Sequence, residues 1–131
     1  MASFCGKFEL VSSENFEELC KVLGVPEELA KAGVAAKTSQ EISMDGDDIT
    51  VKLINDVRTT ANTFRLGEEF DETTPDGRLV KSIVALDGDK MVQVQRAGDI
   101  EVVITREMVG DGLRITIKSG AVVCVRVYKS I

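Results

Sequence analysis

The sequence contains no histidine and no tryptophan among its 131 residues. Histidine is the commonest general base and metal ligand, so its absence excludes hydrolases with a Ser-His-Asp triad and His-ligated metalloenzymes. The sequence also has no Gly-rich phosphate loop and no dinucleotide fingerprint. Several large classes of enzyme are therefore excluded at the outset.

Cysteine is scarce, and long apolar runs are absent. Cys5, Cys20 and Cys124 are odd in number and far apart, unlike the ligands of a zinc site. We expect reduced, buried thiols in a cytoplasmic protein, and we leave a nuclear location open. No apolar segment reaches about 18 residues, and the start has no basic region before an apolar run. We therefore expect neither a membrane span nor a cleaved signal.

The composition is that of an ordinary globular protein, with 44% hydrophobic and 29% charged residues. We expect residues 1–131 to form a single domain, because this length buries a sizeable core without disulfides or a metal. The net charge of -6 argues against nucleic acid as a partner, since that binding depends on Lys and Arg approaching phosphates.

Turn signals divide the second half of the chain into short β-prone segments. Examples are "PDG" at 75–77, "DGD" at 87–89 and "GDG" at 110–112, and most signals lie about 8 to 12 residues apart. This spacing predicts nine consecutive antiparallel strands from about residue 39 to the end. A further strand is predicted near "GKFELVS", at the start of the chain.

Two short helices are predicted between the first strand and the other nine. In "NFEELCKVLG", Asn15 is suited to cap a helix with Glu18, and Gly24 is suited to end it. The apolar face of that helix comprises Phe16, Leu19, Cys20 and Leu23. A second helix is expected after Pro26, with a small-residue face formed by Leu29, Ala32 and Gly33.

Ten antiparallel strands in one small domain expose two sheet edges unless the sheet closes on itself. The predicted fold class is therefore all-β: a ten-stranded antiparallel up-and-down β-barrel with a two-helix lid between the first and second strands. A barrel of this size has room for one small ligand, with the helix pair as a cover.

Two strands place arginine among apolar residues. In "EVVITREM", Arg106 shares a face with Val102 and Ile104. In the last strand, Arg126 and Tyr128 share one face and valines occupy the other, so periodicity alone does not choose the inward face. An inward arginine is costly unless an anion or a hydrogen-bond acceptor meets it, and the inward position of Arg106 favours an inward Arg126 as well.

Arg106, Arg126 and Tyr128 converging inside a barrel would form a receptor for a carboxylate, because guanidinium and phenol groups donate to both of its oxygens. An alkyl tail against the apolar wall would add roughly 0.8 kcal/mol per buried methylene before entropic costs. Head and tail together describe a fatty acid or a similar hydrophobic carboxylate.

Four segments carry a resemblance to a known family: "GKFELVSSENFEE", "LGV", "FRLGEEFDETTPDGRLVKSIVALDG" and "VVCVRVYK". Over essentially its whole length, the chain resembles the intracellular lipid-binding proteins of the lipocalin-like (calycin) class. The middle segment is most similar to heart-type fatty-acid-binding proteins, whereas "SSENFEELCKVLGV" and "VRTTANTF" are similar to the retinoic-acid-binding branch. The resemblance implies a ten-stranded barrel with a helical lid, no cofactor and no metal.

The resemblance also implies a binding site. The carboxylate-binding pattern of the family falls on Arg106, Arg126 and Tyr128. Residues that match positions lining family cavities or their entrance are Phe16, Leu29, Val57, Asp76, Gln95, Ile104 and Ile115. Together with the alternation, the resemblance suggests that Glu72, Gln93 and Gln95 share the cavity with water.

Two departures from the family pattern stand out. Phe8 replaces a usual tryptophan, which we interpret as a conservative core change, and Val57 and Arg58 replace a bulky Phe and a Lys at the entrance. The entrance is thus expected to be wider than in many fatty-acid binders.

The implied function is a carrier, expected to be monomeric, that reversibly binds a long-chain fatty acid; retinoic acid is the alternative ligand. An enzyme would need an acid/base dyad, but the adjacent carboxylates in Glu68-Glu69 or Asp71-Glu72 point to opposite faces of a strand. Transient membrane or partner contact through the helices rests only on Lys21 and Lys31, for which solvated helix charges are the simpler explanation.

Overall fold

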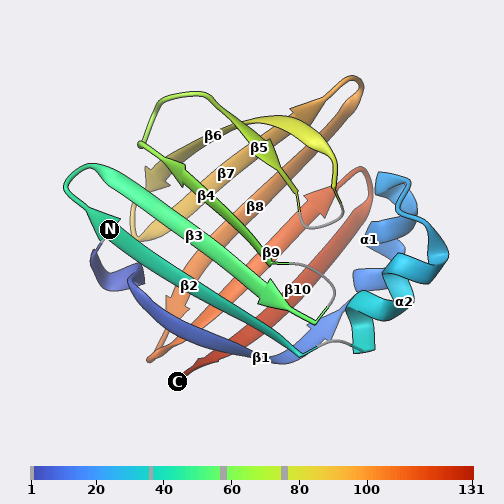
Figure 1. Ribbon diagram of the computed structural model, residues 1–131, viewed down its shortest axis with the longest axis horizontal. Helices are drawn as coiled ribbons and strands as arrows, with labels where there is room; N and C mark the ends of the chain where they lie inside the picture. Colours follow the sequence, from blue (N-terminus) through green and yellow to red (C-terminus); the bar gives the residue numbers. More distant parts are fainter. Residues whose placement is uncertain (1, 36, 57–58, 75–76) are drawn as a thin grey trace.

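The computed structural model describes residues 2–35, 37–56, 59–74 and 77–131. Ten antiparallel strands form a nearly closed barrel, and two helices between β1 and β2 lie at one end (Figure 1). The elements are η1 (Ala2–Phe4), β1 (Gly6–Glu14), α1 (Phe16–Leu23), α2 (Glu27–Ala35), β2 (Thr38–Asp45), β3 (Asp48–Asn55), β4 (Thr59–Phe64), β5 (Phe70–Thr73), β6 (Leu79–Asp87), β7 (Lys90–Ala97), β8 (Ile100–Val109), β9 (Gly112–Ser119) and β10 (Val122–Ser130). The predicted fold class and strand count are confirmed.

The strands follow one another around the barrel in the order β4-β3-β2-β1-β10-β9-β8-β7-β6-β5. Short turns force sequential strands to pair, and Gly88 (φ 62°) and Gly120 (φ 58°) supply the left-handed backbone that such turns need. The sequential strands β4 and β5 are not paired, whereas β1 pairs with β10 as well as with β2. This pairing joins the two ends of the chain and closes most of the barrel.

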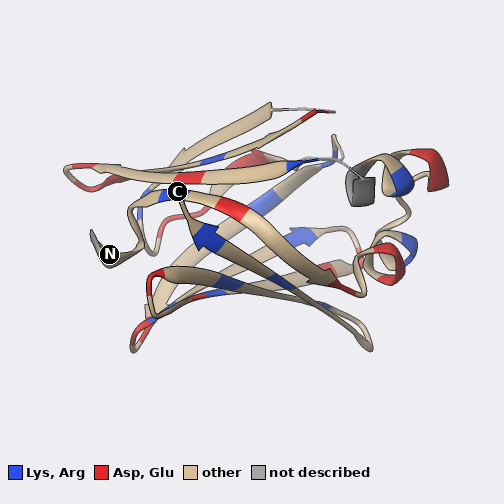
Figure 2. Cartoon of the chain, turned by 90° about the horizontal axis from the view of Figure 1, so that it is seen from below, with Lys and Arg blue, Asp and Glu red and all other residues tan. Residues whose placement is uncertain are grey.

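Inward and outward side chains alternate along the strands, as the sequence predicts. In β10, Cys124 and Tyr128 are buried, whereas Val123 and Val127 are 40% and 36% exposed. Acidic and basic residues are interspersed along the strands and on both helices (Figure 2). Phe8, which we interpret as a core residue, is 2% exposed and belongs to the hydrophobic core.

The helix α1 begins differently from the prediction. Asn15 adopts a left-handed backbone (φ 62°) and makes no side-chain capping bond; instead its Nδ2 donates to the Val123 carbonyl oxygen at 3.0 Å. A capping side chain needs an extended backbone to turn back onto the helix, so the expected capping interaction with Glu18 is wrong. Asn15 ties the helix to β10, and Gly24 ends the helix as predicted.

The packed face of α2 also differs from the prediction. Ala30 is buried at 7% exposure, whereas Leu29 is 44% exposed. This helix packs against α1, which in turn contacts β9 and β10. Leu29 instead lines the cavity, whereas Ala30 is enclosed and Ala32 is partly buried; the surroundings of Gly33 lie outside the described residues.

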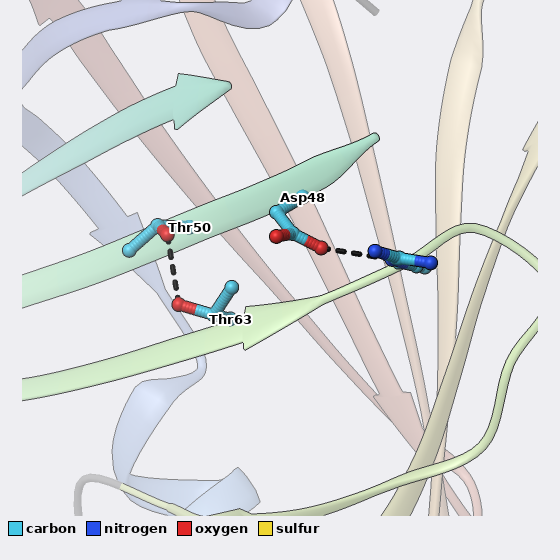
Figure 3. A network of polar contacts seen from close by, with 4 residues as sticks. Asp48, Thr50 and Thr63 are labelled. Carbon is cyan, nitrogen blue, oxygen red and sulfur yellow. Dashed lines mark hydrogen bonds and ion pairs between the residues drawn. The ribbon is translucent and has the colours of Figure 1, made fainter. Parts of the chain in front are cut away.

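The hairpin of β3 and β4 is held by polar contacts on its outer side. Thr50 and Thr63 share a hydrogen bond of 2.8 Å, and Arg65 Nε donates to Asp48 Oδ1 at 2.9 Å. Figure 3 shows Asp48 and Thr50 on β3 and Thr63 on the neighbouring strand. These contacts hold β4 in register with β3, at one edge of the barrel's remaining gap.

The gap lies between β4 and β5, the two ends of the strand order. The rings of Phe64 and Phe70 stack across it with centroids 5.0 Å apart and an interplanar angle of 11°. The turn between the two strands is tied to β6 by a hydrogen bond of 2.8 Å from the Gly67 amide to the Val84 carbonyl. The aromatic pair thus joins the two end strands through side chains.

We expect Phe64 and Phe70 to be energetically coupled, because a stacked aromatic pair contributes beyond its buried area. A cycle of Phe64→Leu, Phe70→Leu and the double variant, followed by urea unfolding, should give a coupling free energy of about 0.5–1.5 kcal/mol. As a control, Phe64→Leu is combined with Val127→Ala on the outer face of β10. The changes that these two substitutions cause in the free energy of unfolding should add. Additive effects in the aromatic pair would show that the stack contributes nothing of its own.

Candidate functional site

The barrel encloses a mostly apolar cavity of about 220 Å³ beneath the two helices. Helix α1 contributes its predicted apolar face, and the strands contribute the remaining walls. Of the residues predicted for the site, those on the cavity lining are Phe16, Leu29, Gln95, Ile104, Arg106, Ile115, Arg126 and Tyr128. Val57 and Asp76, predicted for the entrance, lie outside the described residues, as does Arg58.

Strand register places the two arginines on the same wall. Ile115 of β9 is paired with Arg126 of β10 on one side and with Arg106 of β8 on the other. Directly paired residues share a face, so both arginines and the isoleucine between them point into the barrel. Both arginines are buried, at 7% exposure for Arg106 and 8% for Arg126.

Arg126 is a buried cation that keeps one donor free. Its guanidinium carbon lies 4.4 Å from the centroid of the Phe16 ring, a cation–π geometry. Its Nε has no hydrogen-bond partner among the described residues. A buried donor without a partner is costly to the free energy of folding, so this arrangement is unexpected for a purely structural arginine.

Arg106, in contrast, is held by neighbouring amides. Its Nη1 donates to Gln93 Oε1 at 2.8 Å, and its Nε donates to Gln40 Oε1 at a longer 3.4 Å. Burial lowers the pKa of Arg106, while the nearby Glu72 carboxylate and Tyr128 act in the opposite direction. Arg106 thus belongs to a hydrogen-bonded group that reaches across the cavity.

Glu72 is at the centre of that group. Its Oε1 accepts hydrogen bonds from Ser82 Oγ at 2.6 Å, Gln93 Nε2 at 2.7 Å and Gln95 Nε2 at 3.0 Å. The neighbouring Asp71 is exposed and forms an ion pair with Lys81. The two carboxylates lie on opposite faces of β5, as expected, so they form no acid/base dyad.

Two members of this group, Gln40 and Ser82, were not predicted from the sequence. Both are buried, at 3% and 1% exposure. Gln40 shares one face of β2 with the buried Thr38 and Ile42, so strict alternation would have placed it inside. No local sequence pattern predicts the stacking of Phe16 on Arg126, because these residues are far apart in the sequence.

Tyr128 lies in the same wall and is 2% exposed. Burial raises the pKa of its phenol, and the positive charges of Arg126 and Arg106 partly oppose that rise. The phenol therefore remains protonated, and a donor, well above neutral pH. It is the only tyrosine in the chain.

The cysteines occupy different surroundings, although all three are free. Cys20 and Cys124 are buried as expected, but Cys5 is exposed, because it lies between η1 and β1 at the edge of the barrel. Burial raises the pKa of the Cys124 thiol, against the lowering effects of Arg126 and of a hydrogen bond with Ser13. The Cys124 thiol is thus a poor nucleophile at neutral pH, and Cys20 forms part of the cavity wall.

Comparison with known proteins agrees with this geometry. The model of the lipocalin / cytosolic fatty-acid binding protein family matches residues 1–131. The chain belongs to this family. Its assignment from the four sequence segments is confirmed.

Individual relatives are similar over nearly their full length. Fatty acid-binding protein homolog 6 of Caenorhabditis elegans is 42% identical over 128 residues, covering 95% of each chain. Sodium/calcium exchanger regulatory protein 1 of Doryteuthis pealeii is 39% identical over 130 residues, covering 99% of this chain and 98% of the relative. The solved fatty acid binding protein of Schistosoma mansoni in complex with arachidonic acid superposes with a TM-score of 0.96 at 37% identity, covering 100% of this chain and 98% of that one.

Two further findings concern this family member. None of its helices in the described ranges is long and apolar enough to cross a membrane. Within the same ranges, no cluster of His, Cys, Asp and Glu side chains is arranged to hold a metal ion.

The raised pKa of Tyr128 gives a direct spectroscopic prediction. With a single tyrosine and no tryptophan, the near-ultraviolet phenolate absorbance reports this residue alone. In the folded protein, the phenol should still be mostly protonated at pH 10, whereas in urea it should ionise at its ordinary pKa of about 10.

The same shift affects stability at high pH. The unfolded chain loses the phenol proton first, so the free energy of unfolding should fall from about pH 10 upward until the folded phenol also ionises. Half-ionisation at or below pH 10 in a protein that retains its circular dichroism would contradict the buried position of the phenol.

Proposed function

We propose that this protein is a carrier that reversibly binds a long-chain fatty acid inside the barrel. Arg106, Arg126 and Tyr128 form the carboxylate end of the site, and the apolar walls enclose the alkyl chain. We further propose that it acts as a monomer in the cytoplasm, with a nuclear location left open, and that it has no catalytic activity. Relatives named for fatty-acid binding support the proposal, as does the Schistosoma mansoni homologue solved in complex with arachidonic acid.

The observation that carries the proposal is the state of Arg126. A cation that is 8% exposed, with Nε lacking a partner among the described residues, stands on the wall of an apolar cavity. A ligand carboxylate would supply both the missing acceptor and the missing negative charge. Tyr128 lies two residues further along the same inward face and supplies a second donor.

The walls suit a hydrocarbon chain. Leu19, Leu23, Ile104, Ile115 and Ile117 line the cavity, and each methylene that leaves water contributes roughly 0.8 kcal/mol before the cost of ordering the chain. The tail thus supplies most of the affinity, and the buried head-group contacts fix the orientation.

Contact with membranes through the helices is not part of the proposal. Lys31 forms an ion pair of 3.0 Å with Glu27 one helical turn away, and both side chains are exposed. Lys21 is also exposed, in the last turn of α1. Solvated helix charges account for both lysines.

The test is Arg126→Leu, examined by displacement of a fluorescent fatty acid. Removing the buried cation removes a charge-assisted hydrogen bond worth about 1.5–3 kcal/mol, so the affinity for oleate should fall by roughly 10- to 100-fold. The folded state, however, should be as stable as the wild type or more stable, because a buried charge with a partnerless donor is replaced by an apolar side chain.

Arg114→Leu is the matched control, since Arg114 lies on the outer face of β9 and is paired with Glu107. That variant should bind oleate like the wild type. Unchanged affinity in a folded Arg126→Leu protein would refute the head-group assignment. Competition by retinoic acid in the same assay distinguishes the alternative ligand: the fatty-acid proposal requires oleate to displace the probe at lower concentration.

A further inference from the structure

The two buried arginines differ in whether the protein already compensates their charge. Arg106 donates to Gln93 and Gln40, and the Glu72 carboxylate lies close enough to favour its charged form. Arg126 has no ion pair among the described residues, and the face of the Phe16 ring lies against its guanidinium. Only one of the two cations is therefore left for a ligand to neutralise.

Gln93 connects Glu72 to Arg106 in a fixed orientation. Its Nε2 donates to Glu72 Oε1 at 2.7 Å, and its Oε1 accepts from Arg106 Nη1 at 2.8 Å. A carboxylate accepts only and a guanidinium donates only, so the amide cannot flip without losing both hydrogen bonds. The negative charge of Glu72 is thus coupled to Arg106 through one buried, oriented side chain.

Ser82 and Gln95 also donate to Glu72. Their hydrogen bonds reach the same Oε1 at 2.6 Å and 3.0 Å, so with Gln93 three buried side chains donate to this carboxylate. Among the described residues, the buried charges of the cavity therefore sum to one positive charge, located at Arg126. Arg78, the remaining charged residue on the lining, is only half-buried just before β6 and is not counted among the buried charges.

We infer that Glu72 determines the charge class of the ligand: by compensating Arg106 it restricts the cavity to one singly charged head group at Arg126. This inference rests on the proposed function and adds a specificity-determining residue to it. A monoanion leaves the buried charges of the cavity neutral. A dianion leaves them with an uncompensated negative charge, which is costly for buried groups.

The first test compares two ligands with the same tail on the wild-type protein. At a pH of about 8, hexadecanoate carries one negative charge, whereas hexadecyl phosphate is close to a dianion because its second pKa is about 6. Displacement of a fluorescent fatty acid should give a Kd for the phosphate at least about tenfold higher than for the carboxylate. Equal or tighter binding of the phosphate would mean that both arginines are available to the ligand and would overturn the inference.

The second test is Glu72→Gln, which keeps the shape of the side chain and removes its charge. The Kd for hexadecyl phosphate divided by the Kd for hexadecanoate should fall by about tenfold or more, because Arg106 becomes uncompensated. Using this ratio cancels any effect of the larger phosphate group, which is the same in both proteins.

Glu107→Gln is the matched control, since it removes the same charge from β8 immediately after Arg106. Glu107 points to the outer face and pairs with Arg114. Its Kd ratio should stay within about twofold of the wild type, because this carboxylate lies outside the cavity and is already paired with Arg114. A Glu72→Gln protein that is folded but keeps the wild-type ratio would overturn the inference.

The outcomes separate this inference from the proposed function. If the wild type binds neither ligand nor the fluorescent fatty acid, the carrier proposal itself fails. If it binds both with equal affinity, the carrier proposal stands and the role of Glu72 is refuted. If Glu72→Gln does not fold, phosphate binding by the wild type that equals or exceeds carboxylate binding still refutes the role of Glu72.

Discussion

The buried guanidinium of Arg126 is the constraint on which the rest of the site depends. Its desolvation is costly, and within the described residues the fold provides the face of Phe16 but no acceptor for Nε. The surrounding elements are arranged around this charge: α1 is tied to β10 through Asn15, and Tyr128 follows on the same face. The protein thus keeps a locally unfavourable group whose cost a bound anion would remove.

The paired strands of the barrel allow the fold to tolerate the energetic cost of this buried charge. Ten paired strands satisfy their backbone groups almost everywhere, so the interior can hold polar side chains without a second penalty from the backbone. Glu72, Gln93 and Arg106 form one satisfied network on the opposite side of Ile115 from Arg126. Arg106, whose charge is compensated, and Arg126, whose charge is not, therefore lie on the same wall of the cavity. This asymmetry determines where a negatively charged head group would bind.

Much of this was predictable from the sequence, because the strands are short, alternating and separated by turn residues. The barrel, the inward Arg106 and the helix pair follow from local patterns. The inward face of β10 does not, because valines on one side and Cys124, Arg126 and Tyr128 on the other give no apolar contrast; pairing with Ile115 of β9 fixes it. The contact of Phe16 with Arg126 and the backbone of Asn15 depend on tertiary packing, so neither local periodicity nor capping rules predict them.

The most direct test of the account is the ionisation of a bound ligand. Oleate labelled with carbon-13 at its carboxyl group can be followed by NMR as the pH of its complex is lowered. A head group held by Arg126 beside the protonated Tyr128 should remain ionised, with a titration midpoint at least about one pH unit below that of a solvated carboxyl, about 4.3. A bound carboxyl that titrates at or above that value would show that the head group lies in water or in an apolar pocket, and would contradict the account.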